Sequence, residues 1–245
     1  MKGTCRSVLA TLAILAIMAP LHAAAAEKSV IIGFHNQPGQ AEHALLQGFG
    51  GNVRRQFTRI RATAARVPEE MLTRLRANPK VAYVEDDTPT ALAEPVSGDS
   101  EADNAWGVAR VGALALHARG NLGQGVKIAA LDTGIDASHP ELAASYHGGV
   151  NLIDPASPPL DDSWNGHGTH VAGILAAADD GIGVVGVAPA AELYAVKVSD
   201  GSGYGTVSDL IAGLEWAIAN QIDIVNISLG TATPSLALEQ ACQTA

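Results

Sequence analysis

The sequence predicts an α/β protein: a doubly wound, mostly parallel sheet preceded by a small ferredoxin-like α+β unit. From residue 103 onward, short apolar runs alternate with a segment of helical period, which is typical of strands and helices in one open sheet. Residues 27–94 instead predict the order strand, helix, strand, strand, helix, strand, which is that of the ferredoxin-like unit. A chain of 245 residues, 47% of them hydrophobic, is long enough for both.

Residues 1–26 predict a secretory signal peptide. Lys2 and Arg6 provide a positive start, residues 8–19 form an apolar run, and residues 23–26 are alanines suited to cleavage. The run is too short to span a bilayer comfortably, although an uncleaved anchor or a buried helix is the alternative. We therefore expect a secreted or periplasmic protein without stable membrane association after signal removal. Cys5 would leave with the signal, and Cys242 then has no partner within the chain.

The first region, residues 27–94, predicts four strands and two helices but contains no cluster that suggests catalysis. Pro68 followed by Glu69 and Glu70 favours a helix start, and Asn78-Pro79 favours its end. The predicted strands are 29–34, 53–60, 62–67 and 81–84, and the first helix covers 39–47. Residues 95–102 are small, polar or Pro/Gly-bearing and predict an exposed linker.

The second region, residues 103–245, contains the polar groups that suggest a site. Gly125–Leu131 is an almost continuous apolar strand that ends at Asp132-Thr133-Gly134. The carboxyl end of a buried strand is where open α/β sheets place their sites. Further strands are predicted at 191–198 and 222–228, and a helix at 206–220.

The charge of the chain excludes some partners. A net charge of −10 argues against nucleic acid and anionic membrane surfaces. The charge of region 27–94 is nearly balanced, whereas region 103–245 is acidic. This contrast favours docking of the two regions on each other, with a fluctuation of composition as the alternative.

Asp132 and His167 are the candidate catalytic residues. His167 lies between two glycines at the start of an apolar helix, so its ring is left uncovered. An Asp that binds one imidazole nitrogen fixes the tautomer and stabilises the imidazolium when the His acts as a base. The pair would be the general-base half of a nucleophilic triad.

Several ordered segments resemble the subtilisin-like serine proteases. They are Asp132-Thr133-Gly134-Ile135-Asp136, His167-Gly168-Thr169-His170-Val171-Ala172-Gly173, Gly186-Val187-Ala188-Pro189, Gly201-Ser202-Gly203 and Asn226-Ile227-Ser228-Leu229-Gly230. The resemblance implies that Asp132 orients His167, the general base and acid. It also implies that 27–94 is a propeptide acting as an intramolecular inhibitor, and that 103–245 is the N-terminal part of the peptidase domain.

The resemblance further implies an extended polypeptide substrate, held as an added strand. The residues implied for its two edges are Gly201, Ser202, Gly203, Ser228, Leu229 and Gly230.

Calcium is the one cofactor that the resemblance suggests. Residues 181–186 fit a dinucleotide-binding pattern, but they follow a helix, and Pro189 prevents a helix from starting just after them. In the family this loop can wrap a calcium ion, with oxygen ligands. The comparable positions here are Glu141, Asp180 and the carbonyls of Ile182 and Val184.

The nucleophile of the triad has no counterpart in these 245 residues, since no Gly-Thr-Ser-Met-Ala type segment is present. We expect a secreted serine endopeptidase precursor whose sequence is interrupted before that serine. The alternative is a truncated, catalytically inactive protein that binds peptides or other partners.

Overall fold

The computed structural model describes residues 26–92, 105–181 and 183–245. The predicted signal peptide, except its last residue, and the predicted linker lie outside these ranges. Within them, no helix is both long and apolar enough to cross a membrane.

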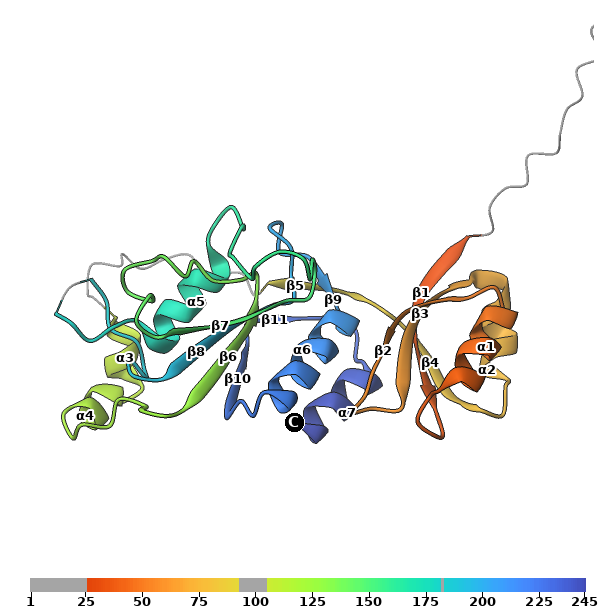
Figure 1. Cartoon of the computed structure of the whole chain (residues 1–245), viewed down its shortest axis with the longest axis horizontal. Coiled ribbons are helices and arrows are strands. Elements are labelled where there is room, and N and C mark those ends of the chain that lie inside the picture. The colour runs from red at the N-terminus through yellow and green to blue at the C-terminus, as the bar shows by residue number, and fades with distance from the viewer. Residues whose placement is uncertain (1–25, 93–104, 182) are drawn as a thin grey trace, which may run out of the picture.

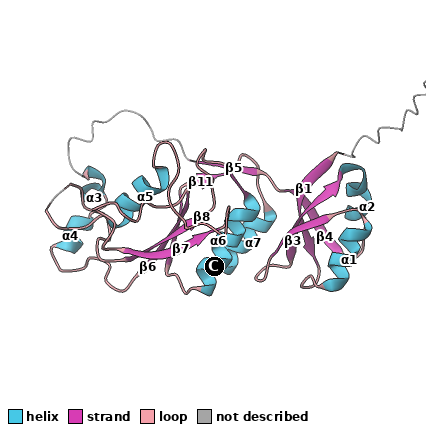
Figure 2. Ribbon diagram, turned by 45° about the horizontal axis from the view of Figure 1, so that its top comes forward, coloured by secondary structure: helices cyan, strands magenta, loops and turns pink. Residues whose placement is uncertain are grey.

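The N-terminal domain is a four-stranded antiparallel sheet in the order β2-β3-β1-β4, which confirms the ferredoxin-like prediction. Its elements are β1 (Glu27–Phe34), α1 (Gln40–Gly48), β2 (Asn52–Gln56), β3 (Ala62–Pro68), a 3₁₀ turn (Glu69–Met71), α2 (Leu72–Arg76) and β4 (Val81–Asp86). The helices α1 and α2 cover one face of the sheet (Figure 2), over a core that includes Ile32, Leu46 and Leu75.

The second domain is built on a parallel sheet in the order β10-β6-β8-β7, which confirms the doubly wound α/β prediction. Its elements are α3 (Trp106–Arg110), α4 (Ala113–His117), β6 (Lys127–Asp132), β7 (Tyr146–Asn151), α5 (His167–Ala176), β8 (Glu192–Lys197), β9 (Gly205–Thr206), α6 (Val207–Ala219), β10 (Ile224–Ile227), β11 (Leu229–Gly230) and α7 (Leu236–Thr244).

Alternate residues of β6 face opposite sides of this sheet, as the pleat of a strand requires. Ala130 packs toward α5 in a cluster with Ala172 and Ala176. Leu131 packs toward α6 in a cluster with Leu210 and Ile211. The central strand is therefore buried on both faces, which explains its continuous apolar sequence.

The two domains share one hydrophobic core. The cluster around α6 also takes in Ile31, Phe57 and Ile60 of the N-terminal domain, together with Ala237 of α7. Figure 1 shows α6 and α7 between the parallel sheet and the N-terminal sheet. The two regions are thus docked on each other, and apolar side chains form part of the interface alongside the Arg55–Asp209 ion pair.

Candidate active site

Asp132 is the last residue of β6 and is completely buried. Its Oδ1 accepts a hydrogen bond from the backbone N–H of Thr133 at 2.7 Å. The strand therefore fixes the backbone of Asp132, and this hydrogen bond fixes the orientation of its carboxylate.

His167 is the first residue of α5, and its Nδ1 lies 2.8 Å from Asp132 Oδ1. The next residue, Gly168, packs so closely on the turn after β6 that a Cβ there would overlap the carbonyl oxygen of Gly134. Glycine at 168 thus lets the helix start reach the strand end. The structure brings the two predicted catalytic residues together.

The electrostatics of the pair follow from burial. Burial raises the pKa of Asp132, while hydrogen bonds from His167 and Thr133 oppose this rise. Oδ2 of Asp132 is buried without a hydrogen-bond partner in the described part of the chain. A carboxylate accepts at Oδ1, so His167 donates from Nδ1, and Nε2 becomes the basic atom of the ring.

The strand β5 (Pro89–Leu92) is the middle strand of a second, three-stranded sheet, in the order β11-β5-β9. Leu92 and Ala91 pair with Leu229 and Gly230 on one side. Pro89 and Thr90 pair with Thr206 and Gly205 on the other. Both pairings are antiparallel, so an extended segment that follows the N-terminal domain lies between two backbone edges of the second domain.

Of the residues predicted to bind substrate, Leu229 and Gly230 form β11. Ser228, just before β11, accepts a hydrogen bond from Asn226 Nδ2 at 2.9 Å. On the other side, the paired residues Gly205 and Thr206 lie beyond the predicted Gly201, Ser202 and Gly203. Those three residues form a turn that Asp200 closes by accepting hydrogen bonds from the backbone N–H groups of Ser202, at 2.8 Å, and Tyr204, at 3.1 Å. On this side β5 therefore pairs with Gly205 and Thr206, which follow the turn, and not with residues 201–203.

Carboxylates of the N-terminal domain cap two helices of the second domain. Asp87 accepts hydrogen bonds from the backbone N–H and the hydroxyl of Ser208 in α6, at 3.1 and 2.8 Å. Glu85 accepts from Ser235 Oγ at 2.7 Å and from the N–H of Leu236 at 3.0 Å, at the start of α7. Sequence reasoning missed these contacts because each joins positions more than 100 residues apart.

The residues suggested for calcium are only partly described. Glu141 lies against the predicted loop, because a Cβ on Gly183 would overlap its Oε1, and its Oε2 is buried without a hydrogen-bond partner in the described part. Ile182 lies outside the described residues. Among the residues that the structure does describe, no group of three or more His, Cys, Asp or Glu side chains could hold a metal ion. A cation here would therefore need backbone carbonyl oxygens in addition to side-chain carboxylates.

The sequence and the fold both resemble known proteins. Residues 123–245 match the Subtilase family, and residues 19–87 match the Fervidolysin N-terminal prodomain. Over 217 residues the chain is 41% identical to Subtilisin E of Bacillus subtilis, a match that covers 87% of this chain and 54% of that protein. It is 54% identical over 140 residues to Subtilisin Savinase of Lederbergia lenta, a match that covers 57% of this chain and 50% of that protein.

The fold is similar to the crystal structure of fervidolysin from Fervidobacterium pennivorans, described as a keratinolytic enzyme related to subtilisin. The TM-score is 0.70 at 24% identity, over 89% of this chain and 38% of that one. The chain spans about half the length of the curated relatives it matches.

Proposed function

This chain belongs to the Subtilase family of peptidases, and we propose that the protein is a secreted serine endopeptidase made as an inhibited precursor. The observation that carries the proposal is the 2.8 Å contact between His167 Nδ1 and buried Asp132 at the ends of two packed elements. Secretion is supported by the charge and hydrophobicity pattern of residues 1–26.

In this proposal His167 is the general base and acid, and Asp132 orients it. Nε2 of His167 takes the proton of a serine hydroxyl as that oxygen attacks the scissile carbonyl, and later delivers it to the leaving amine. Asp132 stays ionised and stabilises the imidazolium formed between the two steps. None of residues 1–245 is assigned the role of the serine.

We further propose that residues 27–94 act as an intramolecular inhibitor, joined by residues 95–102 to a peptidase domain that begins at 103. The position of β5 supports this, because it occupies the space between two strand edges that would pair with an extended polypeptide substrate. The side chain of Thr90 in this strand is also buried, at 1% exposed.

Calcium remains a proposal that rests on Glu141. A buried carboxylate oxygen without a partner in the described part of the chain fits a hard cation, which prefers oxygen ligands. Glu141, Asp180 and the carbonyls of Ile182 and Val184 would hold the ion, and its charge would stabilise the loop after α5. If so, a calcium chelator should lower the unfolding temperature of wild type but not that of Glu141→Gln.

The catalytic proposal is tested by His167→Ala in the complete secreted protein, with His170→Ala as the matched control. His170 is exposed on the same helix, so its loss leaves the Asp132 contact intact. We expect His167→Ala to abolish peptide hydrolysis and His170→Ala to retain it. Full activity of His167→Ala would contradict the role of His167. Absence of hydrolysis in the wild-type protein would support the alternative, a non-catalytic protein that keeps the peptide-binding edges.

A further inference from the structure

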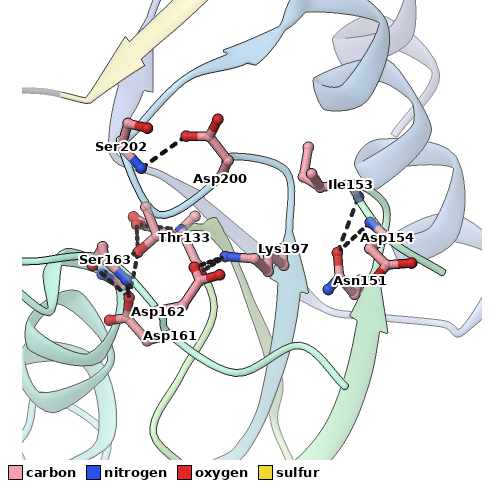
Figure 3. Close-up of polar contacts among 12 residues, drawn as sticks. Thr133, Asn151, Ile153, Asp154, Asp161, Asp162, Ser163, Lys197, Asp200 and Ser202 are labelled. Carbon is pink, nitrogen blue, oxygen red and sulfur yellow. Dashed lines mark hydrogen bonds and ion pairs between the residues drawn. The ribbon is translucent and has the colours of Figure 1, made fainter. Parts of the chain in front are cut away.

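Asp161 lies in the loop before α5, six residues from His167, and collects hydrogen bonds from three separate places. Its Oδ1 accepts from Thr133 Oγ1 at 3.0 Å and from Ser163 Oγ at 2.5 Å. Its Oδ2 accepts from the backbone N–H and the hydroxyl of Thr169, at 2.9 and 2.7 Å. Figure 3 shows the Thr133, Asp161 and Ser163 side chains converging beside the strand end.

These contacts replace the missing cap of α5. The N-cap residue is Gly166, which has a φ of 64° and no side chain to accept from the first turn. Instead, the N–H of His167 donates to Ser163 Oγ at 3.1 Å, and the N–H of Gly168 donates to Thr133 Oγ1 at 3.0 Å. The third N–H, that of Thr169, donates to Asp161 itself.

The groups that accept hydrogen bonds from the first turn of α5 therefore all depend on the carboxylate of Asp161. Ser163 and Thr133 accept from the helix with the same hydroxyl oxygens from which they donate to Asp161. Asp161 Oδ1 is the nearest acceptor for the Thr133 hydroxyl proton, at 3.0 Å against 3.3 Å for Asp132 Oδ1. An ionised Asp161 thus directs both hydroxyl protons toward itself and leaves the oxygen lone pairs for the helix. Burial opposes ionisation of Asp161, but hydrogen bonds from Ser163 and Thr169 outweigh it and lower the pKa of the carboxyl.

The neighbouring Asp162 anchors the same loop to the parallel sheet. Its Oδ1 lies 2.6 Å from Nζ of Lys197, a side chain that is only 4% exposed. Lys197 Nζ also donates to the carbonyl oxygen of Thr133, and Lys197 pairs with Asp132 in the β6–β8 register. Asp161 and Asp162 thus both connect this loop to Thr133, the residue that follows Asp132 at the end of β6 (Figure 3).

We propose that Asp161 is a positioning residue, which fixes the first turn of α5 and thereby holds the His167 ring against Asp132. The proposal deepens the proposed function and rests on it, because the position of the ring matters for the reaction only if His167 is the base. A displacement of about 1 Å at such a group can cost about 100-fold in rate.

The test compares Asp161→Ala and Asp161→Asn with Asp154→Asn in the 245-residue chain. Asp154 is a matched control: its carboxylate also accepts from a nearby serine, Ser157 Oγ at 2.5 Å, and from a backbone N–H, that of Ala156 at 3.2 Å, but on an exposed turn. The readout is the low-field ¹H NMR resonance of the proton between His167 and Asp132, identified by its loss in His167→Ala. Circular dichroism at the same temperature confirms that each variant is folded.

We expect the resonance to be lost in Asp161→Ala, to shift or weaken in Asp161→Asn, and to persist unchanged in Asp154→Asn. A folded Asp161→Ala with the wild-type resonance overturns the proposal, as does an equal loss in the control. If Asp161→Ala does not fold, Asp161→Asn tests the proposal, and a folded Asp161→Asn with the wild-type resonance overturns it.

In the complete enzyme, Asp161→Asn should lower kcat about 100-fold with little change in KM. A complete protein without peptidase activity would contradict the proposed function alone, because the resonance reports on Asp161 independently of turnover.

Discussion

The carboxylate of Asp87 accepts two hydrogen bonds from Ser208, a residue 121 positions later in the chain, and so joins the N-terminal domain to the first turn of α6. Asp87 is only 8% exposed, and Arg54 lies 3.8 Å from its Oδ2. A carboxylate at a helix start satisfies N–H groups that have no partner within the helix, and interacts favourably with the helix dipole.

Replacing Asp87 by Ala should weaken the docking of the two domains by about 1–2 kcal/mol, because it removes a helix cap. Thermal unfolding and the hydrogen exchange of β1–β4 amides would measure the change. Asp86→Ala is the control, since Asp86 is half exposed and pairs with Lys28 on the surface, at 2.8 Å. That change should cost no more than about 0.5 kcal/mol, and an equal effect of the two would contradict the capping role.

Asp87 also makes the free energy of unfolding depend on pH. Burial raises the pKa of Asp87 above its ordinary value of 3.8, although hydrogen bonds from Ser208 act in the opposite direction. The folded protein therefore binds this proton more tightly than the unfolded chain. The stability contributed by that proton binding is fully present below 3.8 and is lost as pH rises through the raised pKa.

Asp87→Asn should remove this dependence. The free energy of unfolding of wild type minus that of the variant should then increase as pH is lowered through the acidic range. Denaturant titrations at a series of pH values would measure it, and a difference that decreases on acidification would show that Asp87 is ionised more readily in the folded state.

Replacement by Ala should have opposite effects on stability at two glycines of α5. Gly168→Ala should destabilise the protein by about 1–3 kcal/mol and separate His167 from Asp132, because its Cβ would overlap the Gly134 carbonyl. Gly173→Ala should stabilise the helix by up to about 1 kcal/mol, since nothing lies within 4 Å of a Cβ there. Chemical denaturation of both variants checks the contrast, and a neutral Gly168→Ala would refute the close approach.

Replacement of glycine by Ala should also have different effects in β9 and β11, the two strands that pair with β5. A Cβ on Gly205 would overlap the Val198 carbonyl oxygen and lie 2.9 Å from Thr90 Oγ1, whereas one on Gly230 meets nothing within 4 Å. We expect Gly205→Ala to speed hydrogen exchange at Thr90 and Ala91, and Gly230→Ala to leave it near the wild-type rate. The same exchange in both variants would mean that β5 is not held by its β9 edge.

Local sequence was enough to predict the strands β1, β3, β4, β6, β8 and β10 and the helices α1, α2, α5 and α6, and to single out Asp132 and His167 as a candidate pair. Asp132 follows an apolar run that only a buried strand explains, and the glycines beside His167 mark a helix start within a few residues. In contrast, β7 was missed because Gly148 and Gly149 interrupt its apolar pattern. The short strands β9 and β11 have two residues each, too few for any period to appear.

The supporting contacts could not be predicted for a different reason. Asp161 is separated from His167 by a loop whose course no local rule specifies, and Glu85 and Asp87 act on helices more than 100 residues away. Acidic residues in such positions are indistinguishable by sequence from ordinary solvated charges. Only the tertiary structure gives each of them its partner.

The core shared by Phe57, Ile60 and α6 has a consequence for biosynthesis. Ribosomes deliver a chain from its N-terminus, so β1–β4 can pair before α6 and α7 leave the exit tunnel. When the two helices emerge, their apolar sides meet a finished sheet rather than water. The order of residues along the chain thus gives the later segment a template and spares it a period of exposed, aggregation-prone surface.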